Sequence, residues 1–328
     1  MEALRLFLKK IKLGGKQTHL NMTLIPLLAS DAGEPDYLIL EEASGQGSAE
    51  ITEISQGGSV PDLRLINKSA HKLLVVDGEE LVGAKQNRIV NATFLIAGQT
   101  EITIPVSCVE QGRWSYRSQK FASGKKVMPS SMRRVHQKVV AMSLEMGAGF
   151  RSDQGMIWDE LALKRERMAV HSSTGAMADL FEGQKDRLGE YLKAFRLVDC
   201  QIGAVFAING EIVGLECFGH QQTFSKFFQK LVQSYALDAL DWLEGGDNNQ
   251  VSTESVRHFL AGVQNAPCKL HPSLGLGENI RFESNSVSGA SLVLDGRVVH
   301  LSAFSHSGHK SDGHRTSFQP FSQRERRR

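Results

Sequence analysis

Long apolar runs are missing from this sequence, and no stretch of 18 consecutive apolar residues occurs. A helix needs about 20 mostly apolar residues to cross the hydrocarbon core of a bilayer. The apolar start at 4–13 is too short, lysines interrupt it, and no small-residue cleavage site follows. The sequence therefore predicts a cytoplasmic protein with no secretory signal and no membrane partner.

Closely spaced cysteines and an excess of one charge are also missing. The four cysteines, Cys108, Cys200, Cys217 and Cys268, lack the close spacing of a zinc site. With 38 basic and 36 acidic residues, the chain lacks the basic excess of proteins that bind nucleic acids. It contains no phosphate loop, no dinucleotide-binding glycine pattern and no nucleophile elbow. We expect reduced thiols, no metal and no cofactor. The charge balance disfavours a nucleic-acid partner and leaves binding through the basic tail as a weaker third hypothesis.

Proline is scarce, and its distribution divides the chain. None of the 8 prolines falls between Pro129 and Pro267. Because proline breaks helices, its absence favours a mainly helical part at 132–264. The part at 18–114 instead has short apolar runs separated by turn residues, which are typical of an antiparallel sandwich or meander. The pattern predicts an α+β protein.

Apolar periodicity predicts where the helices lie. They are expected at 132–146, 154–168, 185–195, 221–243 and 252–263. The helix at 221–243 carries an aromatic stripe, which is more typical of a core-facing surface than of a cofactor site. The polar segment 115–131 is expected to be a loop because glycine and proline interrupt it.

Three dipeptides between apolar runs predict tight β-hairpins: Asp77-Gly78, Asn209-Gly210 and Asp295-Gly296. The favoured two-residue turn needs a positive φ at both residues, which Gly, Asn and Asp adopt most readily. The hairpin at 279–304 could join the same core as the rest of the chain.

We expect one domain at 18–304, between a lead segment at 1–17 and a disordered tail at 305–328. The tail is basic and contains His306, His309 and His314. These histidines have a loose metal-like spacing, but in a Ser/Gly-rich tail such residues are more typically solvated.

The densest polar stretch is GEELVGAKQNRIV. Glu79 and Glu80 follow the turn, and Gln86, Asn87 and Arg88 lie between two apolar strands. Such a run is typical of a solvated turn. It also suits an anionic or sugar ligand, because arginine contacts phosphate in a forked geometry and amides pair with hydroxyls.

A second stretch, PVSCVEQGRW, has Glu110, Arg113 and Trp114 at the end of an apolar strand. Tryptophan can stack on a base or sugar while arginine holds charge, or the residues can form a structural ion pair beside a half-buried ring. If both stretches lie at one end of a sheet, Glu80 and Glu110 could act as an acid/base pair on a glycosidic bond.

The cysteines give weaker signals for catalysis. Cys108 alternates within an apolar strand, which is typical of a core residue. Cys217 precedes His220 by three positions and could form a dyad with it, and Glu216 could face the same pocket.

The two polar stretches, VDGEELVGAKQNRIV and IPVSCVEQGRW, resemble the ARG and rhodanese-phosphatase-superfamily-associated protein domain family, where ARG stands for ADP-ribosylglycohydrolase. LNMTLIPL, YLILEEA and GAVFAINGEIVGLECFG extend the resemblance over about 18–304. It implies a bacterial-type cytosolic protein linked by genome context to ADP-ribose and NAD-derived nucleotides. It supplies no established reaction.

Two functional hypotheses follow. In the first, the chain binds or processes ADP-ribose, another NAD-derived nucleotide or a similar anionic sugar. Arg88 and Arg113 would hold the diphosphate and Trp114 would stack on the base, while Glu80 or Glu110 would be the acid/base if chemistry occurs. In the second, the chain is a non-catalytic interaction module for a partner enzyme. Whether it is an enzyme stays open.

Overall fold

The computed structural model describes residues 2–30, 33–55, 57–243 and 251–307. The expected tail, with His309 and His314, lies outside the described residues from 308 onward. The described residues form eight helices: α1 (Glu2–Lys9), α2 (Leu40–Gly45), α3 (Ser130–Glu145), α4 (Gln154–Arg167), α5 (Met177–Gly183), α6 (Lys185–Ala194), α7 (Gln221–Asp241) and α8 (Thr253–Asn265). The five helices expected from periodicity are all present, and none of the described helices is long and apolar enough to cross a bilayer.

A nine-stranded antiparallel sheet combines strands from the start, middle and end of the described chain. Its order is β1-β3-β13-β14-β18-β17-β16-β15, and β2 pairs with β3. The strands are β1 (Lys12–Leu13), β2 (Gln17–His19), β3 (Met22–Leu28), β13 (Gln201–Ile208), β14 (Glu211–Phe218), β15 (Cys268–Pro272), β16 (Glu278–Glu283), β17 (Val287–Leu294) and β18 (Arg297–Ser305). The C-terminal hairpin therefore joins the same sheet as the N-terminal β3.

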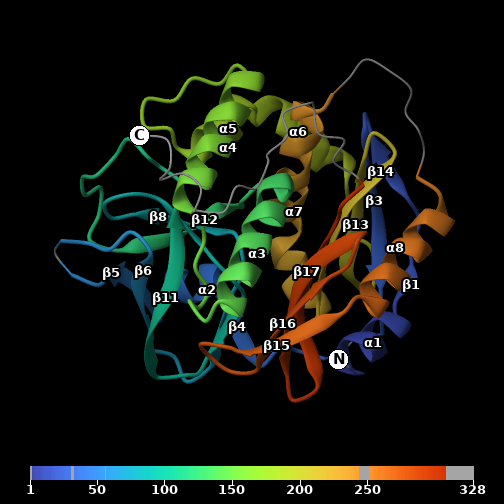
Figure 1. Cartoon of the computed structure of the whole chain (residues 1–328), viewed down its shortest axis with the longest axis horizontal. Helices are drawn as coiled ribbons and strands as arrows, with labels where there is room; N and C mark the ends of the chain where they lie inside the picture. Colours follow the sequence, from blue (N-terminus) through green and yellow to red (C-terminus); the bar gives the residue numbers. More distant parts are fainter. Residues whose placement is uncertain (1, 31–32, 56, 244–250, 308–328) are drawn as a thin grey trace.

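The other strands form a closed six-stranded barrel and a small sheet (Figure 1). The barrel order is β11-β6-β5-β12-β8-β9, and the small sheet has the order β10-β7-β4. The barrel strands are β5 (Ala49–Glu53), β6 (Asp62–Asn67), β8 (Glu79–Gly83), β9 (Arg88–Val90), β11 (Thr100–Cys108) and β12 (Phe121–Val127). The small sheet contains β4 (Tyr37–Ile39), β7 (Lys72–Val75) and β10 (Phe94–Ile96), with β4 parallel to β7.

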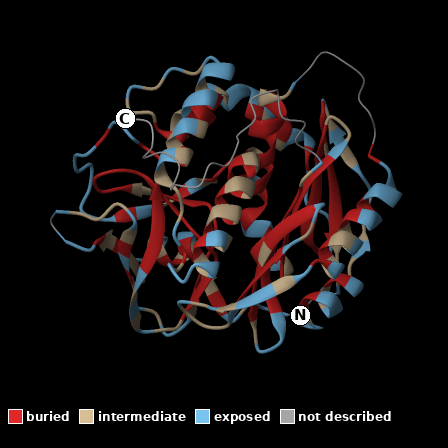
Figure 2. Ribbon diagram, in the orientation of Figure 1, coloured by how far each residue is buried: buried red, intermediate tan, exposed pale blue. Residues whose placement is uncertain are grey.

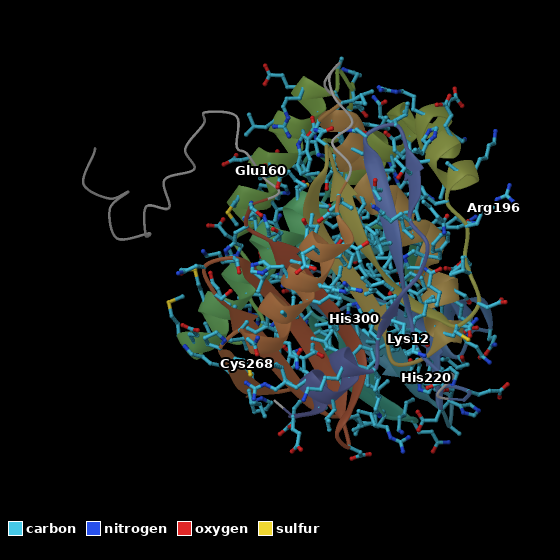
Figure 3. All side chains as sticks on the ribbon, turned by 90° about the vertical axis from the view of Figure 1, so that its right-hand side faces the viewer. Lys12, Glu160, Arg196, His220, Cys268 and His300 are labelled. Atoms are coloured by element: carbon cyan, nitrogen blue, oxygen red, sulfur yellow. The ribbon has the colours of Figure 1, made fainter. Side chains whose placement is uncertain are left out.

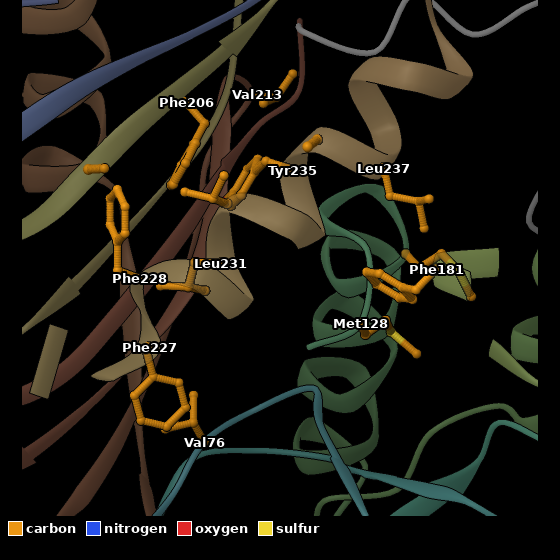
Figure 4. Packing of buried hydrophobic residues seen from close by; sticks show 14 of the residues in the cluster. Val76, Met128, Phe181, Phe206, Val213, Phe227, Phe228, Leu231, Tyr235 and Leu237 are labelled. Carbon is orange, nitrogen blue, oxygen red and sulfur yellow. The ribbon is translucent and has the colours of Figure 1, made fainter. Parts of the chain in front are cut away.

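The large sheet is buried on both faces. Successive side chains of a strand point to opposite sides, and each side packs against helices. In β13, Phe206 packs with α7 on one side, whereas Val205 packs with α1 and α8 on the other. Helix α7 contacts both the sheet and barrel strand β12, and Figure 4 shows Tyr235 beside Phe206 and Phe227 beside Val76. Phe206 stacks on Tyr235 with ring centroids 3.9 Å apart. The aromatic stripe of α7 is therefore core, as predicted, and Figure 2 shows this buried centre between exposed helices.

Two predicted hairpins are confirmed and one is wrong. Asn209-Gly210 joins β13 to β14, Asp295-Gly296 joins β17 to β18, and all four residues have positive φ. At Asp77-Gly78 only Gly78 has a positive φ, and the flanking strands part. Strand β7 pairs in the small sheet, whereas β8 pairs in the barrel. The dipeptide makes a turn between two sheets because β7 pairs with β10 and β4, whereas β8 pairs with β12 and β9.

Two further expectations need correction. The α+β class is confirmed, but the sandwich expected for 18–114 is not, because strands of this region close into a barrel. The segment 115–131, expected to be a loop, contributes β12, which closes that barrel between β5 and β8. Its polar sequence, FASGKKV, leaves only Phe121, Gly124 and Val127 buried, so apolar content did not reveal a strand.

Candidate functional site

The two polar stretches meet at one end of the barrel. Strand β9 pairs with β11, so that Arg88 lies opposite Cys108. The residue just before β9 and the residue just after β11 are held together by the backbone hydrogen bond from Val109 N to Asn87 O, at 3.0 Å. Pairing in this register brings Gln86 and Asn87 beside Glu110. The sequence-predicted convergence of the two strand ends is present in the structure.

Arg113 ties this corner together from within. Its guanidinium donates to the carbonyl oxygens of Ala84 at 2.6 Å and Ser115 at 2.8 Å. It also donates to Glu110 Oε2 at 2.6 Å and Asn87 Oδ1 at 3.1 Å. Protein acceptors therefore use both terminal nitrogens of Arg113. This arrangement stabilises the loop geometry and leaves little of the guanidinium to a ligand.

Glu110 is the ionic partner of Arg113 and is fully buried. Burial by itself would raise the pKa of Glu110, but the Arg113 guanidinium, the Asn87 N–H and the Thr174 hydroxyl hold it below its ordinary value. The Thr174 hydroxyl donates to Oε1 at 3.1 Å. Glu110 is thus an ionised carboxylate that accepts hydrogen bonds at both oxygens.

Arg88 points into the barrel and keeps unused donors. It lies opposite Leu81 and Cys108, which share its face of the ladder, and it is fully buried. Its Nη1 donates to Gln86 Oε1 at 2.9 Å, while Nε and Nη2 have no hydrogen-bond partner within the described residues. Burial lowers the pKa of Arg88. A buried guanidinium with two unpaired donors is costly unless another molecule supplies acceptors.

Glu53 is a site residue that the sequence reasoning missed. Its partner in the ladder is Leu63, which also lies opposite Ile104, so Glu53 shares the interior face of the barrel. Its carboxylate is buried, and neither oxygen has a hydrogen-bond partner in the described part of the chain. The available signal was its position: in AEITEIS, Glu53 falls on the same face as buried Ile51.

Aromatic rings cover this end of the barrel from outside. Trp114 is 49% exposed, and its ring lies 5.1 Å from Lys85 Nζ and 5.8 Å from the Arg88 guanidinium carbon. Tyr116, 44% exposed, lies 5.2 Å from the same lysine nitrogen. We call the group Glu53, Lys85, Arg88, Trp114 and Tyr116 the barrel mouth. It combines stacking surface, positive charge and a buried carboxylate.

Glu80 lies on the other face of the same strands. It is opposite Ile89, whereas its neighbour Leu81 is opposite Arg88. Its Oε1 is buried without a hydrogen-bond partner among the described residues. Burial raises the pKa of Glu80 to about 7, with nearby Glu110 adding to the rise and Lys126 opposing it. Glu80 therefore stays protonated at mildly acidic pH, where Glu110 is ionised.

Glu79 is directed away from the barrel mouth. Its Oε1 accepts from Ser123 Oγ at 3.0 Å and from Lys230 Nζ of α7 at 3.2 Å. Glu79 thus joins the barrel to the central helix. Among the predicted ligand-binding residues, Gln86, Asn87, Arg88, Arg113 and Trp114 are gathered at the corner, while Glu79 is not.

The predicted Cys217–His220 dyad is not formed. Cys217 packs in the apolar layer beneath α1 and α8, where burial raises its pKa above the ordinary range. His220 is instead hydrogen-bonded through Nδ1 to the Gly33 carbonyl at 2.9 Å. Glu216 faces the opposite side of β14 and binds Arg133 of α3. The expected core position of Cys108 is confirmed.

A polar network that the sequence did not reveal surrounds Glu216. His300 lies 3.2 Å from Glu216 Oε2 through Nε2, and 2.8 Å from Thr93 Oγ1 through Nδ1. Asp77 accepts from Gln137 Nε2 at 2.5 Å. The residues come from the turns beside β7 and β10, from α3 and from the large sheet, so no local pattern links them. Asp77, Thr93, Gln137 and His300 line a cavity of about 10 Å³, which is the size of one water molecule.

Comparison with known protein families decides the affiliation of the chain. The model of the ARPP-1 domain, the ARG and Rhodanese-Phosphatase-superfamily-associated Protein domain, matches residues 10–304. The chain belongs to this family. The ARPP-1 match includes both polar stretches and every strand of the barrel, and so confirms the resemblance read from the motifs. Searches of curated proteins and of solved structures return no match.

No group of three or more His, Cys, Asp or Glu side chains is placed to hold a metal ion in the parts of the chain that the structure describes. The buried polar groups without partners are instead the guanidinium donors of Arg88 and the carboxyl oxygens of Glu53 and Glu80. Such groups suit an organic ligand with both acidic and hydroxyl groups.

Proposed function

We propose that the barrel mouth binds an anionic nucleotide-type ligand such as ADP-ribose or another NAD-derived nucleotide. The observation that carries the proposal is Arg88, whose Nε and Nη2 are buried without acceptors behind a half-exposed tryptophan. A phosphate supplies two oxygens in the geometry that a guanidinium favours. Trp114 supplies the stacking surface for a base.

The neighbouring groups suit the rest of such a ligand. Lys85 adds a second positive charge beside Trp114, although it also donates to the Gly57 carbonyl at 2.7 Å. Glu53 has two carboxylate oxygens ready to accept from ribose hydroxyls. Because Trp114 covers Arg88 in this structure, the ligand would reach Arg88 by displacing the indole ring.

Chemistry on the bound ligand would need a proton donor, and Glu80 is the candidate. The pKa of Glu80 is raised to about 7 while that of Glu110 is lowered, which is the difference an acid/base pair requires. Glu80 lies on the face of β8 opposite to the barrel interior, however, and Glu110 is engaged with Arg113. The geometry therefore supports binding better than turnover.

Ligand binding can be measured by thermal shift and calorimetry with ADP-ribose, NAD and AMP. A ligand at about 100 times its Kd should stabilise the protein by about 2.7 kcal/mol. Trp114→Ala removes an exposed ring and should weaken binding by about 1–3 kcal/mol, or roughly 5- to 150-fold. Arg88→Gln should reduce the preference for AMP over adenosine at least tenfold, because Lys85 is then the remaining positive charge of the barrel mouth.

Arg64→Gln is the matched control because Arg64 lies on the outer face of the barrel, paired with Glu101 at 2.7 Å and 46% exposed. It should leave ligand affinity unchanged. No stabilisation by any of these nucleotides at millimolar concentration would contradict the proposal.

A second candidate function is a non-catalytic interaction module. The favouring observation is that the exposed rings of Trp114 and Tyr116 lie near the same lysine nitrogen, because neighbouring exposed aromatic side chains are typical of protein contacts. Trp114→Ala would then weaken capture of a partner protein without changing nucleotide affinity. Measuring both quantities on one variant distinguishes the two functions.

A further inference from the structure

A first cavity of ligand size lies away from the barrel mouth, where the N-terminal strand β1 faces helix α8. Its volume is about 460 Å³, within the range of about 300–1,000 Å³ that is usual for ligand pockets. Its walls come from the turn after α1, from β1 and β3, and from α8. Figure 1 shows these elements together at one side of the large sheet, and Figure 3 shows Lys12 on that face.

The floor of this cavity is apolar. Ile25 of β3 and Val256 of α8 are almost fully buried in the layer between the sheet and α8, and Leu260 packs against them. Floor residues of this kind favour a ligand with a hydrocarbon part, because burying apolar surface is stabilising by roughly 25 cal/mol per Å².

The rim of the same cavity is positively charged. Lys12, Lys16 and Arg257 all line it. Lys16 Nζ donates to the Val251 carbonyl at 2.9 Å, which fixes its ammonium group at the edge. Arg257 has a distant carboxylate partner, Glu254, at 4.0 Å, and both side chains are largely exposed. A pair of this kind contributes little to stability, so the guanidinium can turn to a ligand.

The cavity on the other side of α8 has the opposite character. It has a volume of about 490 Å³, and its charged wall residues include Glu211 and Glu254 but neither lysine nor arginine. The positive rim is therefore a property of one side of α8 and does not extend around it. An anionic head group would be attracted to the first cavity and repelled from the second.

From these observations we propose that the first cavity binds a single-chain amphiphilic anion, with its hydrocarbon chain on Ile25, Val256 and Leu260. Its carboxylate would lie between Lys12, Lys16 and Arg257. The site shares no residue with the barrel mouth, so the inference is independent of the proposed nucleotide function.

Dodecanoate is a suitable probe, used with the full chain at concentrations below micelle formation. Calorimetry should show saturable binding of dodecanoate and at least tenfold weaker binding of dodecanol, which has the same chain without the charge. Added salt should weaken dodecanoate binding because it screens exposed charges. Equal affinity for the two compounds, or no binding of dodecanoate, would overturn the proposal.

Charge reversal locates the site. Lys12→Glu combined with Arg257→Glu should reduce dodecanoate affinity at least tenfold and leave the unfolding midpoint of the free protein nearly unchanged. Lys9→Glu is the matched control, because Lys9 is exposed on α1 and does not line the cavity. Loss of binding in Lys9→Glu equal to that in the double variant would show a diffuse charge effect and overturn the proposal.

Leu260→Trp tests the floor without altering charge, since the larger ring would fill the cavity. It should exclude dodecanoate while the circular dichroism spectrum stays native. A membrane surface is the competing explanation for a basic rim with an apolar floor. Affinity for phosphatidylglycerol vesicles can be measured by co-sedimentation. If the protein binds these vesicles as tightly as dodecanoate, and Leu260→Trp does not change that affinity, the membrane explanation is favoured and the cavity assignment is overturned.

Discussion

Arg133 Nη1 lies 2.5 Å from Glu216 Oε1, and neither side chain exposes any surface. Arg133 comes from α3 and Glu216 from β14, so this ion pair joins a helix to the centre of the large sheet. Burial opposes the charge on Glu216, yet Arg133 and His300 hold the pKa of that carboxyl below its ordinary value. The charges are compensated within the core.

Removing one partner of this pair should be strongly destabilising. We expect Arg133→Met to lower the free energy of unfolding by about 3–5 kcal/mol, because Glu216 would be left buried without its counter-ion. Urea denaturation measures the change. Arg64→Met, which breaks the exposed pair with Glu101, is the control and should cost at most about 1 kcal/mol. Equal losses of unfolding free energy in the two variants would show that the buried pair stabilises the fold no more than the exposed pair does.

Two glycines with nearly the same backbone conformation should respond differently to alanine. Gly78 has φ +74 and Gly296 has φ +71. A Cβ at Gly78 would come within 2.5 Å of Arg133 Cδ, whereas one at Gly296 meets no atom within 4 Å. Both changes incur backbone strain of about 1 kcal/mol, and Gly78→Ala should cost clearly more because it displaces Arg133. Thermal unfolding of both variants tests this, and equal midpoints would contradict it.

Glu80 should make stability fall as pH rises. Its pKa is about 7 in the folded protein against an ordinary value of 4.5, so between these values the folded state binds a proton that the unfolded state has released. The stabilising contribution of Glu80 to the free energy of unfolding is complete below pH 4.5 and is lost above about pH 7. In Glu80→Gln this dependence disappears.

The unfolding free energy of Glu80→Gln relative to the natural protein should therefore rise with pH. The change between about pH 4.5 and pH 8 should be on the order of 3 kcal/mol. Urea titrations at both pH values provide the comparison. A constant difference between the two proteins at all pH values would mean that Glu80 titrates normally.

Titration of His136 should change the stability of the fold with pH in the direction opposite to that of Glu80. Burial is the main cause that lowers the pKa of His136 to about 4, while neighbouring Asp77 only partly opposes the shift. The folded state then resists protonation that the unfolded chain accepts, so the histidine destabilises the fold as pH drops from 6.5 towards 4. Nuclear magnetic resonance of the imidazole nitrogens should show a neutral ring at pH 5 in the folded protein. A protonated ring there would refute the assignment.

Local signals predicted the elements whose partners are adjacent in the chain. Asn209-Gly210 and Asp295-Gly296 formed hairpins because the two strands on either side of each turn pair with each other. The long apolar stripe of α7 was sufficient to predict both its helix and its burial. The stretches that contain Arg88 and Trp114 lie together because β9 and β11 pair with each other.

Distant partners were not predictable in this way. Asp77-Gly78 has the same turn signal as the two true hairpins, but its flanking strands find partners in different sheets. The sequence indicated only a charged residue in a strand at Glu53. Closure of the barrel places its side chain in the barrel interior. Arg133 and Glu216 are separated in the sequence by helices α4, α5 and α6 and by strand β13, and only tertiary packing joins them.

The position of β18 in the large sheet has a consequence for synthesis of the chain. Strand β18 is the last of the described strands to leave the ribosome, yet it occupies the place between β14 and β17. Until Arg297–Ser305 emerges, the nascent sheet is split into two halves with open edges. The six barrel strands are all synthesised by Val127, so the barrel can form before the last described strand of the sheet has been synthesised.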